Sequence, residues 1–358
     1  GSWTVCTPET TEKCCAVGFF FARRIFEQTK IPIGLIWSAW AGSIIREWIP
    51  RFGWRLVPEL RSEADAIDAW YPNTKVGRTV WKQSLEAYEG WLAKAEGSIK
   101  AGEPFPLQEP KMPQPPQQRG TTTFYNGKIH PVVPYALKGF LWYQGESDSR
   151  TQNYVELKKA LVRSWRKLFA DGDLIPFYYM QIQRSGDYCS PLVRDQQFKS
   201  LSIPNTGMAV LLDLDIDVHP QNKYDSGERL ALWALAKDYG KEVVFSGPLY
   251  KGHKVEGNRM TIEFDHSGPG LMIGSKDKLN PAREVRGGKL RNIKIAGKDK
   301  RWHPAESKIV GNQLEVWSEK VAEPAAVRYC YENIPKEPFL YNRAGLPAAQ
   351  FKTDDWAR

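Results

Sequence analysis

The sequence predicts an α/β protein with a parallel sheet covered by helices on both faces, followed by an antiparallel β module. Apolar strands alternate with helical segments as far as residue 240, and polar residues follow each strand at its carboxyl end. Beyond residue 240 the pattern changes to short segments of alternating apolar and polar residues, separated by Gly and Asn. We therefore predict an α/β domain over residues 1–242 and a β module over residues 243–358.

The N-terminal third predicts one strand among helices and turns. Residues 11–29 predict a mostly buried helix, and residues 33–37 predict a short apolar strand. Residues 38–43 are mostly small, and small residues at a strand-to-helix turn allow backbone N–H groups to face a ligand. Residues 59–100 predict one or two polar helices with apolar stripes. Residues 104–118 contain six prolines, which predicts an extended loop, and such loops often rim active sites.

The remaining elements continue the alternation and then give way to strands. In the α/β part we predict a turn at 123–128, a strand at 137–143, a helix at 154–168 with Gly172 as its C-cap, strands at 176–182 and 207–214, and a helix at 224–239 that ends at Gly240. In the β module we predict strands at 260–264, 293–295, 314–316 and 327–329. These short alternating strands favour a small sandwich.

Polar residues at four predicted strand ends should meet at one edge of the sheet, where ligands of open α/β sheets bind. They are Ser38 and Gly42, Gln144 and Glu146, Gln181 and Gln183, and Asp213 to His219. His219 stands between the last strand and the last helix of this part. Because an unperturbed imidazole has a pKa of about 6.5, His219 can act as a base at neutral pH.

These residues supply most of the parts of a serine esterase. His219 would remove the proton from a serine hydroxyl and later protonate the leaving alcohol. Asp217 would orient the imidazole, and Glu146 is a second candidate for that acidic partner. The backbone N–H of Gly42 and the side chain of Gln144 would stabilise the oxyanion.

The nucleophile is the missing part. The chain contains no G-x-S-x-G elbow. Ser38, Ser43 and Ser147 fall at the correct edge, but each follows a turn that suits an oxyanion loop or a positioning loop better. We do not assign the nucleophile to any of the three.

Composition excludes several other classes of protein. The formal net charge is +9, but the sequence has no run of five Lys or Arg, so nucleic-acid binding is not predicted. No apolar stretch approaches the roughly 18 residues of a membrane helix. The spacing of the five Cys matches no zinc pattern, and we expect neither a metal nor a cofactor. The cysteines leave the cellular compartment open.

Several segments together resemble the sialate O-acetylesterase family, within the SGNH (GDSL-like) hydrolases, and similar bacterial carbohydrate acetylesterases. The matching pieces are Trp3 to Thr10, Pro32 to Ile36, Tyr125-Asn126-Gly127, Leu141 to Ser147 (LWYQGES), Asp217 to Lys223 (DVHPQNK) and Leu340 to Ala348. The resemblance covers the whole chain. It implies a three-layer α/β/α, flavodoxin-like sheet and the hydrolysis of acetyl esters of sugars by a Ser/His/acid mechanism without a metal.

The resemblance also implies residue roles. His219 is the base with Asp217 as its partner, Gly42 represents the second conserved block of the family, and Gln144 to Glu146 represent the third. We add Asn126 to the expected oxyanion or substrate-binding residues. We add Trp40 because Trp37, Trp40 and Trp142 could stack on a sugar, although burial is an equal alternative for these rings.

The sequence departs from the family at two points. Many SGNH enzymes place the acid three residues before the His, where this chain has Ile216, so the acid is either Asp217 or Glu146. The family's Gly-Gln-Ser-Asn-Met-like block, which carries the nucleophile on the first strand of the sheet, is absent. We therefore expect an N-terminal segment of the same protein to supply that serine, as a separate chain after proteolysis or as a part lost by truncation.

The expected partners are an acetylated carbohydrate, such as sialic acid or xylan, and the N-terminal segment. The family suggests a periplasmic, secreted or lysosomal setting. Two alternatives stay open, a non-catalytic carbohydrate-binding protein of the same fold and a glycosidase that uses Glu146. A glycosidase needs a second carboxylate roughly 5–10 Å away, and no clear one lies outside the turn that carries His219.

Overall fold

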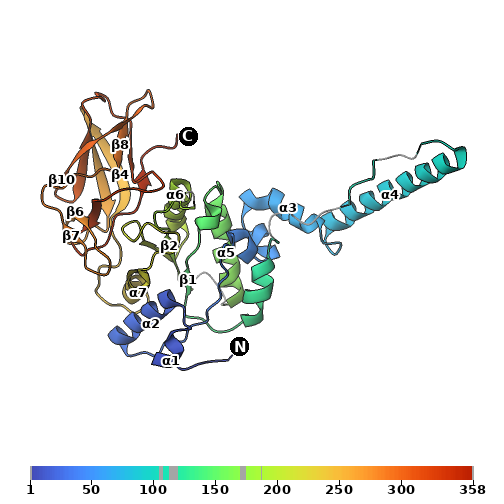
Figure 1. Ribbon diagram of the computed structural model, residues 1–358, viewed down its shortest axis with the longest axis horizontal. Helices are drawn as coiled ribbons and strands as arrows, with labels where there is room; N and C mark the ends of the chain where they lie inside the picture. Colours follow the sequence, from blue (N-terminus) through green and yellow to red (C-terminus); the bar gives the residue numbers. More distant parts are fainter. Residues whose placement is uncertain (1, 105–107, 113–119, 170–174, 187, 357–358) are drawn as a thin grey trace. The chain divides into compact units, whose positions relative to one another are not determined.

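A computed structural model describes residues 2–104, 108–112, 120–169, 175–186 and 188–356 (Figure 1). Contacts divide the chain into two compact units. The first comprises Gly1–Ile44, Leu137–Val155 and Asp173–Arg358, and the second comprises Ile45–Ala136 and Glu156–Gly172. The parallel sheet and the C-terminal β module both belong to the first unit. The change of secondary structure near residue 242 is thus not the division between the two units.

A three-stranded parallel sheet forms the centre of the first unit. The strands are β1 (Phe140–Trp142), β2 (Phe177–Gln181) and β3 (Thr206–Val210), in the order β1-β2-β3. All five residues of β2 are buried, as expected for a parallel strand with both faces covered. The predicted parallel sheet is confirmed, although each strand is shorter than its apolar run.

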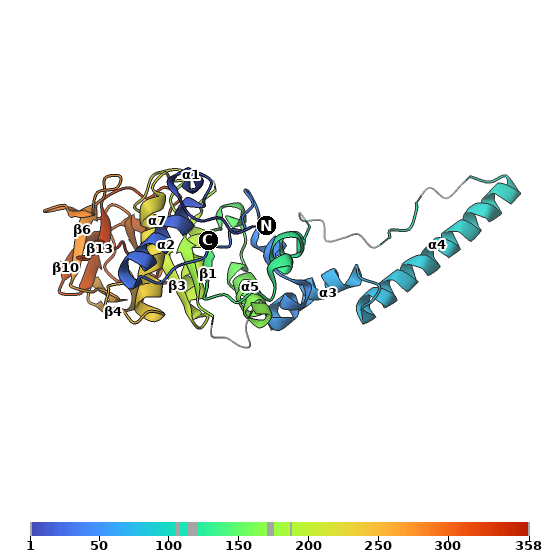
Figure 2. The same ribbon diagram turned by 90° about the horizontal axis from the view of Figure 1, so that it is seen from below.

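Helices α2 (Ala16–Thr29) and α7 (Lys223–Lys237) lie side by side on one face of this sheet (Figure 2). Ile25 of α2 packs in a buried cluster with Tyr178 and Met180 of β2, together with residues of α7. The two helices approach closely at Gly227, where a Cβ atom would lie 2.6 Å from the carbonyl oxygen of Val17.

The opposite face of the sheet packs against α6 (Pro191–Lys199). Successive side chains of a strand point to opposite faces, so Tyr179 points away from Tyr178 and Met180. The Tyr179 hydroxyl donates a hydrogen bond of 2.8 Å to the carbonyl oxygen of Gln197 in α6. The first unit therefore has the predicted three-layer α/β/α arrangement around the sheet.

The C-terminal part is antiparallel, as predicted. Its strands are β4 (Leu249–Glu256), β5 (Arg259–Asp265), β6 (Leu271–Ser275), β7 (Arg283–Glu284), β8 (Ile293–Ala296), β9 (Trp302–Pro304), β10 (Glu306–Val310), β11 (Gln313–Trp317), β12 (Ala326–Tyr329), β13 (Phe339–Asn342) and β14 (Phe351–Lys352). They form sheets in the orders β10-β11-β5-β4, β14-β12-β8-β9 and β13-β6-β7. The four predicted strands correspond to β5, β8, β11 and β12.

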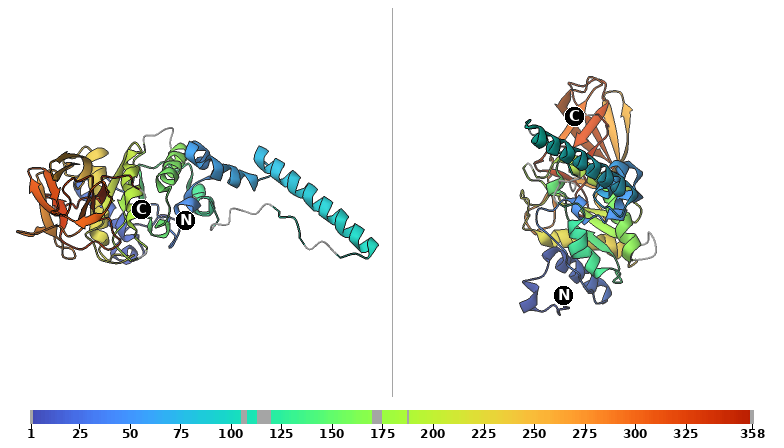
Figure 3. Two further views of the ribbon diagram at one scale, coloured as in Figure 1. Left: turned by 90° about the horizontal axis from the view of Figure 1, so that it is seen from above. Right: turned by 90° about the vertical axis from the view of Figure 1, so that its right-hand side faces the viewer.

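The second unit is helical. It contains η1 (Ile45–Trp48), η2 (Arg51–Leu56), η3 (Pro58–Leu60), α3 (Arg61–Ala69), α4 (Lys75–Ala101), η4 (Tyr125–Ile129), η5 (His130–Val132) and most of α5 (Tyr154–Phe169). Figure 3 shows α4 as one uninterrupted helix. The Thr74 side chain caps its N-terminus by accepting a 2.8 Å hydrogen bond from the N–H of Gly77. Gly102 ends the helix in the left-handed conformation, with φ 67°.

Three sequence predictions need correction. Residues 33–37 are extended but form no strand with any described residue, and Trp37 is 64% exposed. The predicted helix at 11–29 is divided into α1 (Pro8–Thr11) and α2, and only Gly18 and Ile25 of α2 are buried. The predicted turn at 123–128 is helical instead, because the N–H of Asn126 donates to the carbonyl oxygen of Thr122 at 2.9 Å.

Parts of the predicted loop at 104–118, and the predicted C-cap Gly172, lie outside the described residues. No described helix is long and apolar enough to cross a membrane. Within the described ranges, no group of three or more His, Cys, Asp or Glu side chains could hold a metal ion.

The close approach of α2 and α7 gives a test of the packing. Gly227→Ala should destabilise the protein by about 1–3 kcal/mol, because the added methyl overpacks the helix contact. Gly97→Ala in α4 is the matched control, since nothing lies within 4 Å of the added Cβ. The control should stabilise by up to about 1 kcal/mol. Urea unfolding measures both changes, and a Gly227→Ala protein as stable as the native one contradicts the described contact.

Candidate active site

The three parallel strands end at one edge of the sheet, and polar residues follow each end. Gln144 and Glu146 follow β1, Gln183 follows β2, and the loop of residues 211–222, which carries His219, follows β3. All of them belong to the first unit. The sheet therefore gathers the predicted catalytic residues at the edge where ligands of such folds bind.

The side chain of Gln183 connects the loop after β1 to the loop after β3. Its Nε2 donates to Glu146 Oε1 at 3.2 Å and to the carbonyl oxygen of Val218 at 2.7 Å. Its Oε1 accepts a 2.8 Å hydrogen bond from the Tyr143 hydroxyl. Because Val218 immediately precedes His219, one amide group fixes the His219 turn beside Glu146. In the sequence, Gln183 stands at the end of a predicted strand, and that position alone does not indicate this role.

Glu146 is a half-buried carboxyl group that Gln183 connects to the turn carrying His219. Burial raises the pKa of Glu146 above its usual value. The hydrogen bond from Gln183 and the charge of His219 oppose this shift and lower the pKa. The charge of His219 is therefore one of several smaller influences on the pKa of Glu146, and burial has the largest effect.

Lys223 adds a cation to this cluster. Its Nζ lies 5.4 Å from the centroid of the Tyr143 ring. Burial lowers the pKa of Lys223, and the charges of Glu146 and Asp217 act in the opposite direction. Lys223 lies in the DVHPQNK segment, four residues after His219. Its place in that segment is the sequence feature that could have indicated a cation beside His219.

The turn that carries His219 is exposed and is shaped by two aspartates. Asp217 Oδ1 accepts a 2.8 Å hydrogen bond from the backbone N–H of His219. Asp215 Oδ2 accepts from the N–H groups of Gln221 and Asn222, at 3.1 and 3.4 Å. The Asp217 contact is of the Asx type, and together with the two Asp215 contacts it fixes the backbone of the turn. Asp217 is thus seen to hold the main chain of His219, and its predicted contact with the imidazole stays untested.

Gln144 has a different environment from the one that the sequence suggested. The side chain is buried, and its Nε2 donates to the carbonyl oxygen of Ser43 at 3.1 Å and to Asp148 Oδ2 at 2.6 Å. Its Oε1 lies 3.0 Å from the Tyr154 hydroxyl. Both amide hydrogens are used, so the side chain cannot serve as the predicted oxyanion donor in this arrangement. Gln144 thereby connects the segment that contains Gly42 and Ser43 to the segment of Gln144 to Glu146.

Gly145 is required by a close approach of side chains. A Cβ atom at this position would lie 2.6 Å from Gln197 Nε2 and 3.0 Å from Ile182 Cγ2. Gln197 Nε2 donates to the carbonyl oxygen of Gln144 at 3.1 Å, and its Oε1 accepts from the N–H of Ile182 at 2.9 Å. Gln197 thereby joins the ends of β1 and β2.

The other predicted site residues are distributed as follows. Gly42 is exposed in a turn with φ 69°, a backbone conformation that favours glycine. Trp40 and Trp37 are 60% and 64% exposed, whereas Trp142 is buried and cannot stack on a sugar. Asn126 is exposed on η4 of the second unit. The structure thus brings Glu146 and the turn of Asp217 and His219 together in the first unit, whereas Asn126 belongs to the second unit.

No serine hydroxyl of the described residues hydrogen-bonds to the imidazole of His219. Ser43 is buried, and its carbonyl oxygen accepts from Gln144. Ser147 is exposed on η6 (Glu146–Asp148). The described site therefore contains a candidate base and two candidate acids, but no nucleophile in contact with the base.

Comparisons with known proteins agree with one another. A family model described as "Carbohydrate esterase, sialic acid-specific acetylesterase" matches residues 118–231, which include β1 to β3 and the His219 turn. The sialate O-acetylesterase of Rattus norvegicus is 32% identical over 266 residues, which are 66% of this chain and 45% of that protein. The Homo sapiens enzyme is 30% identical over 260 residues, covering 65% and 41%. The chain thus spans less than half the length of these two relatives.

A solved structure extends the similarity to almost the whole chain. A carbohydrate acetylesterase from Xanthomonas citri superposes with a TM-score of 0.73 at 31% sequence identity. The match covers 99% of this chain and 69% of that one. Both the α/β/α layers and the β module therefore have counterparts in one known structure.

The bridge made by Gln183 can be tested through the carboxyl group that it contacts. Gln183→Leu should raise the pKa of Glu146 further, because the variant loses a hydrogen bond that stabilises the carboxylate. A ¹³C NMR titration of the Glu146 carboxyl measures this. Gln313→Leu is the matched control, since Gln313 donates a similar 3.3 Å hydrogen bond to Glu263 in the β module. If the pKa of Glu146 is the same in the native protein, in Gln183→Leu and in Gln313→Leu, the result counts against the bridge made by Gln183.

Proposed function

We propose that this chain, which belongs to the sialate O-acetylesterase family of carbohydrate acetylesterases, contributes the base and the acid of an enzyme that removes O-acetyl groups from sugars. The observation that carries this proposal is the cluster of His219, Gln183 and Glu146 at the carboxyl edge of the sheet. The expected substrate is an acetylated carbohydrate, either a sialic acid or a polysaccharide such as xylan.

His219 acts as the proton carrier in this mechanism. A serine Oγ attacks the acetyl carbonyl carbon while His219 takes the serine proton, and the carbonyl oxygen becomes an oxyanion. The backbone N–H of Gly42 is the proposed oxyanion donor. As the intermediate collapses, His219 gives its proton to the sugar oxygen, which leaves as an alcohol. Water then attacks the acetyl-enzyme, His219 accepts the water proton, and acetate and the free serine are released.

The contacts favour Glu146 over Asp217 as the acid that stabilises the imidazolium. Glu146 is half-buried, lies in the field of His219 and is aligned by Gln183. Asp217 is exposed and accepts a hydrogen bond from the main chain of His219. A carboxylate in a less hydrated position interacts more strongly with a nearby charge. Asp217 then maintains the turn, and Glu146 carries the electrostatic role.

The serine comes from outside the 358 residues in this proposal. Two features support a missing neighbour in the sheet. β1 is an edge strand among the described strands, and the apolar residues 33–37 are extended with no partner strand in the part of the chain that the structure describes. Unpaired strand edges and exposed apolar segments are what an additional strand would cover. An added strand that carried the serine would deliver it to the edge where His219 lies.

His219→Ala should lower kcat for acetate release by about 100- to 10,000-fold, because the general base is lost. The assay uses the native polypeptide that contains these residues, with an aryl acetate, acetylated xylan and an O-acetylated sialic acid as substrates. Retained turnover in the variant overturns the mechanism. Acetate release from none of the substrates favours a carbohydrate-binding protein, and reducing sugar without acetate favours a glycosidase.

A pair of isosteric variants identifies the acid. Glu146→Gln should lower kcat by at least about 100-fold, a loss typical of a group that assists proton transfer. Asp217→Asn should have a smaller effect, because the amide oxygen can still accept from the His219 N–H. Steady-state kinetics on an aryl acetate measures both, and the reverse order assigns the acid to Asp217.

A serine-directed fluorophosphonate locates the nucleophile. We expect the probe to label the native polypeptide at a serine outside residues 1–358, and we expect the 358 residues alone to be unlabelled and inactive. Peptide mass mapping reads out the modified residue. Labelling at Ser38, Ser43 or Ser147, with turnover by the 358-residue chain, places the nucleophile within it instead.

A further inference from the structure

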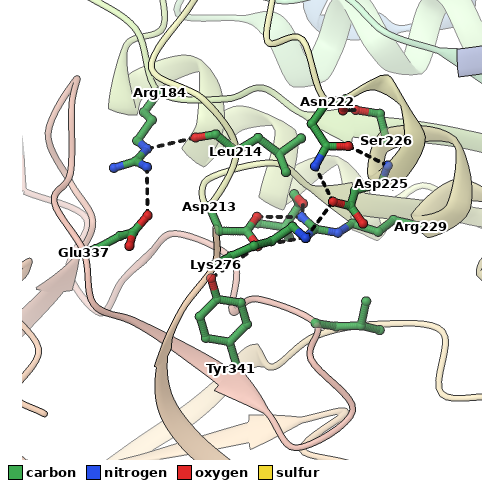
Figure 4. A network of polar contacts seen from close by, with 12 residues as sticks. Arg184, Asp213, Leu214, Asn222, Asp225, Ser226, Arg229, Lys276, Glu337 and Tyr341 are labelled. Atoms are coloured by element: carbon green, nitrogen blue, oxygen red, sulfur yellow. Dashed lines mark hydrogen bonds and ion pairs between the residues drawn. The ribbon is translucent and has the colours of Figure 1, made fainter. Parts of the chain in front are cut away.

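The loop that carries His219 is attached at both of its ends to the C-terminal β module (Figure 4). The loop follows β3 and runs to the N-cap of α7 at Asn222. Ile216, Asp217 and His219 at its tip are exposed, so packing at the tip cannot fix the position of the imidazole. The order of the tip therefore depends on its main-chain hydrogen bonds, such as the one from Gln183 to Val218, and on how the two ends are anchored.

Arg184 anchors the first end of the loop. This buried guanidinium extends from the segment after β2, and its Nε donates to the carbonyl oxygen of Leu214 at 3.2 Å. Its other nitrogens contact the β module, with Nη1 3.0 Å from the carbonyl oxygen of Pro335 and Nη2 3.2 Å from Glu337 Oε1. The rigid planar fork of an arginine holds the loop and the module at the same time.

Asp213, at the base of the loop, is held from two sides. Arg229 of α7 forms a two-pronged ion pair with it, at 2.6 and 2.7 Å. The Tyr341 hydroxyl of β13 donates to Asp213 Oδ2 at 3.2 Å. All three side chains are buried, so the β module supplies one of the donors that a buried carboxylate requires.

Lys276 anchors the second end. It follows β6, its side chain is only 4% exposed, and its Nζ lies 2.8 Å from Asp225 Oδ2 in the first turn of α7. Asn222 Nδ2 donates to the same carboxylate and, at 3.0 Å, to the carbonyl oxygen of Lys278. Figure 4 shows Asn222 and Lys276 converging on the carboxylate of Asp225. The start of α7 is therefore fastened to the segment after β6.

We infer that the β module is part of the framework of the active site, and that Lys276 and Arg184 are positioning residues for His219. The functional half of this inference rests on the proposed function, because only there does His219 act on a substrate. The structural half stands on the contacts alone. If the β module served only to bind substrate, ion pairs and hydrogen bonds between the module and both ends of this loop would not be needed.

Hydrogen exchange of the native polypeptide that contains these residues tests the anchor without any assay of activity. Lys276→Met removes the charge at similar length and should accelerate exchange of the amides at 217–222 by about tenfold or more, while the amides of β2 and β3 keep their native rates. Lys276→Arg keeps the charge and should give a smaller increase. Lys251→Met is the matched control, since Lys251 pairs with Asp265 at 3.1 Å on the exposed surface of the same module.

Native exchange rates at 217–222 in Lys276→Met overturn the inference, as does an equal acceleration throughout the sheet. If Lys276→Met does not fold, Arg184→Lys provides the test. It keeps the charge but cannot hold the Leu214 carbonyl and Glu337 with the same fork, so it should accelerate exchange in the loop alone, and native rates overturn the inference.

An NMR spectrum of the His219 imidazole links the anchor to the site. The imidazole resonance should change its chemical shift in Lys276→Met and remain native in Lys251→Met. An unchanged chemical shift contradicts a positioning role. Full activity of His219→Ala in the native polypeptide overturns the proposed function and leaves the exchange result intact, so the two failures are distinguishable.

Discussion

The buried ion pair between Asp213 and Arg229 is the contact on which the arrangement of the first unit depends. It joins the end of β3 to the middle of α7, and Tyr341 extends it into the β module. Burial lowers the pKa of Arg229, but the charge and hydrogen bonds of Asp213 outweigh burial and the net shift is upward. Removing one partner of such a pair typically costs 3–5 kcal/mol, because it leaves an uncompensated buried charge. The ion pair thus fixes the position of Asp213, at the base of the His219 loop, relative to α7.

Amide side chains connect the strand ends that form the candidate site, with Gln144 and Gln183 following β1 and β2, and Gln197 on α6. Gln144, Gln183 and Gln197 each contact groups from two different loops, so they keep the ends of β1, β2 and β3 in register. Amide side chains suit this work because each can donate and accept at once without adding charge. A buried network that is fully satisfied specifies one geometry, whereas a partly satisfied one destabilises the fold. Loss of one glutamine therefore affects neighbouring loops together.

Much of the fold could be read from periodicity. The helix at α5 and the strands at β2 and β3 follow directly from their apolar patterns, because local pattern and tertiary environment agree there. Residues 33–37 have the same apolar character but form no strand, since a strand requires a partner backbone and the described residues offer none. Gln144 looked like an oxyanion donor because its position was known and its hydrogen-bond partners were not. Those partners come from residues as far away as Ser43.

The sequence by itself determined the class of fold, the edge of the sheet at which the candidate catalytic residues lie, and the choice of His219, Glu146 and Asp217 as those candidates. These depend on local order along the chain, namely which residue follows which strand. Only the tertiary structure decided that Gln183 joins Glu146 to the His219 turn, that Gln144 is committed to other loops, and that the β module anchors the His219 loop through Arg184 and Lys276. Those contacts join residues that are distant along the chain, and no local pattern encodes which distant groups will meet.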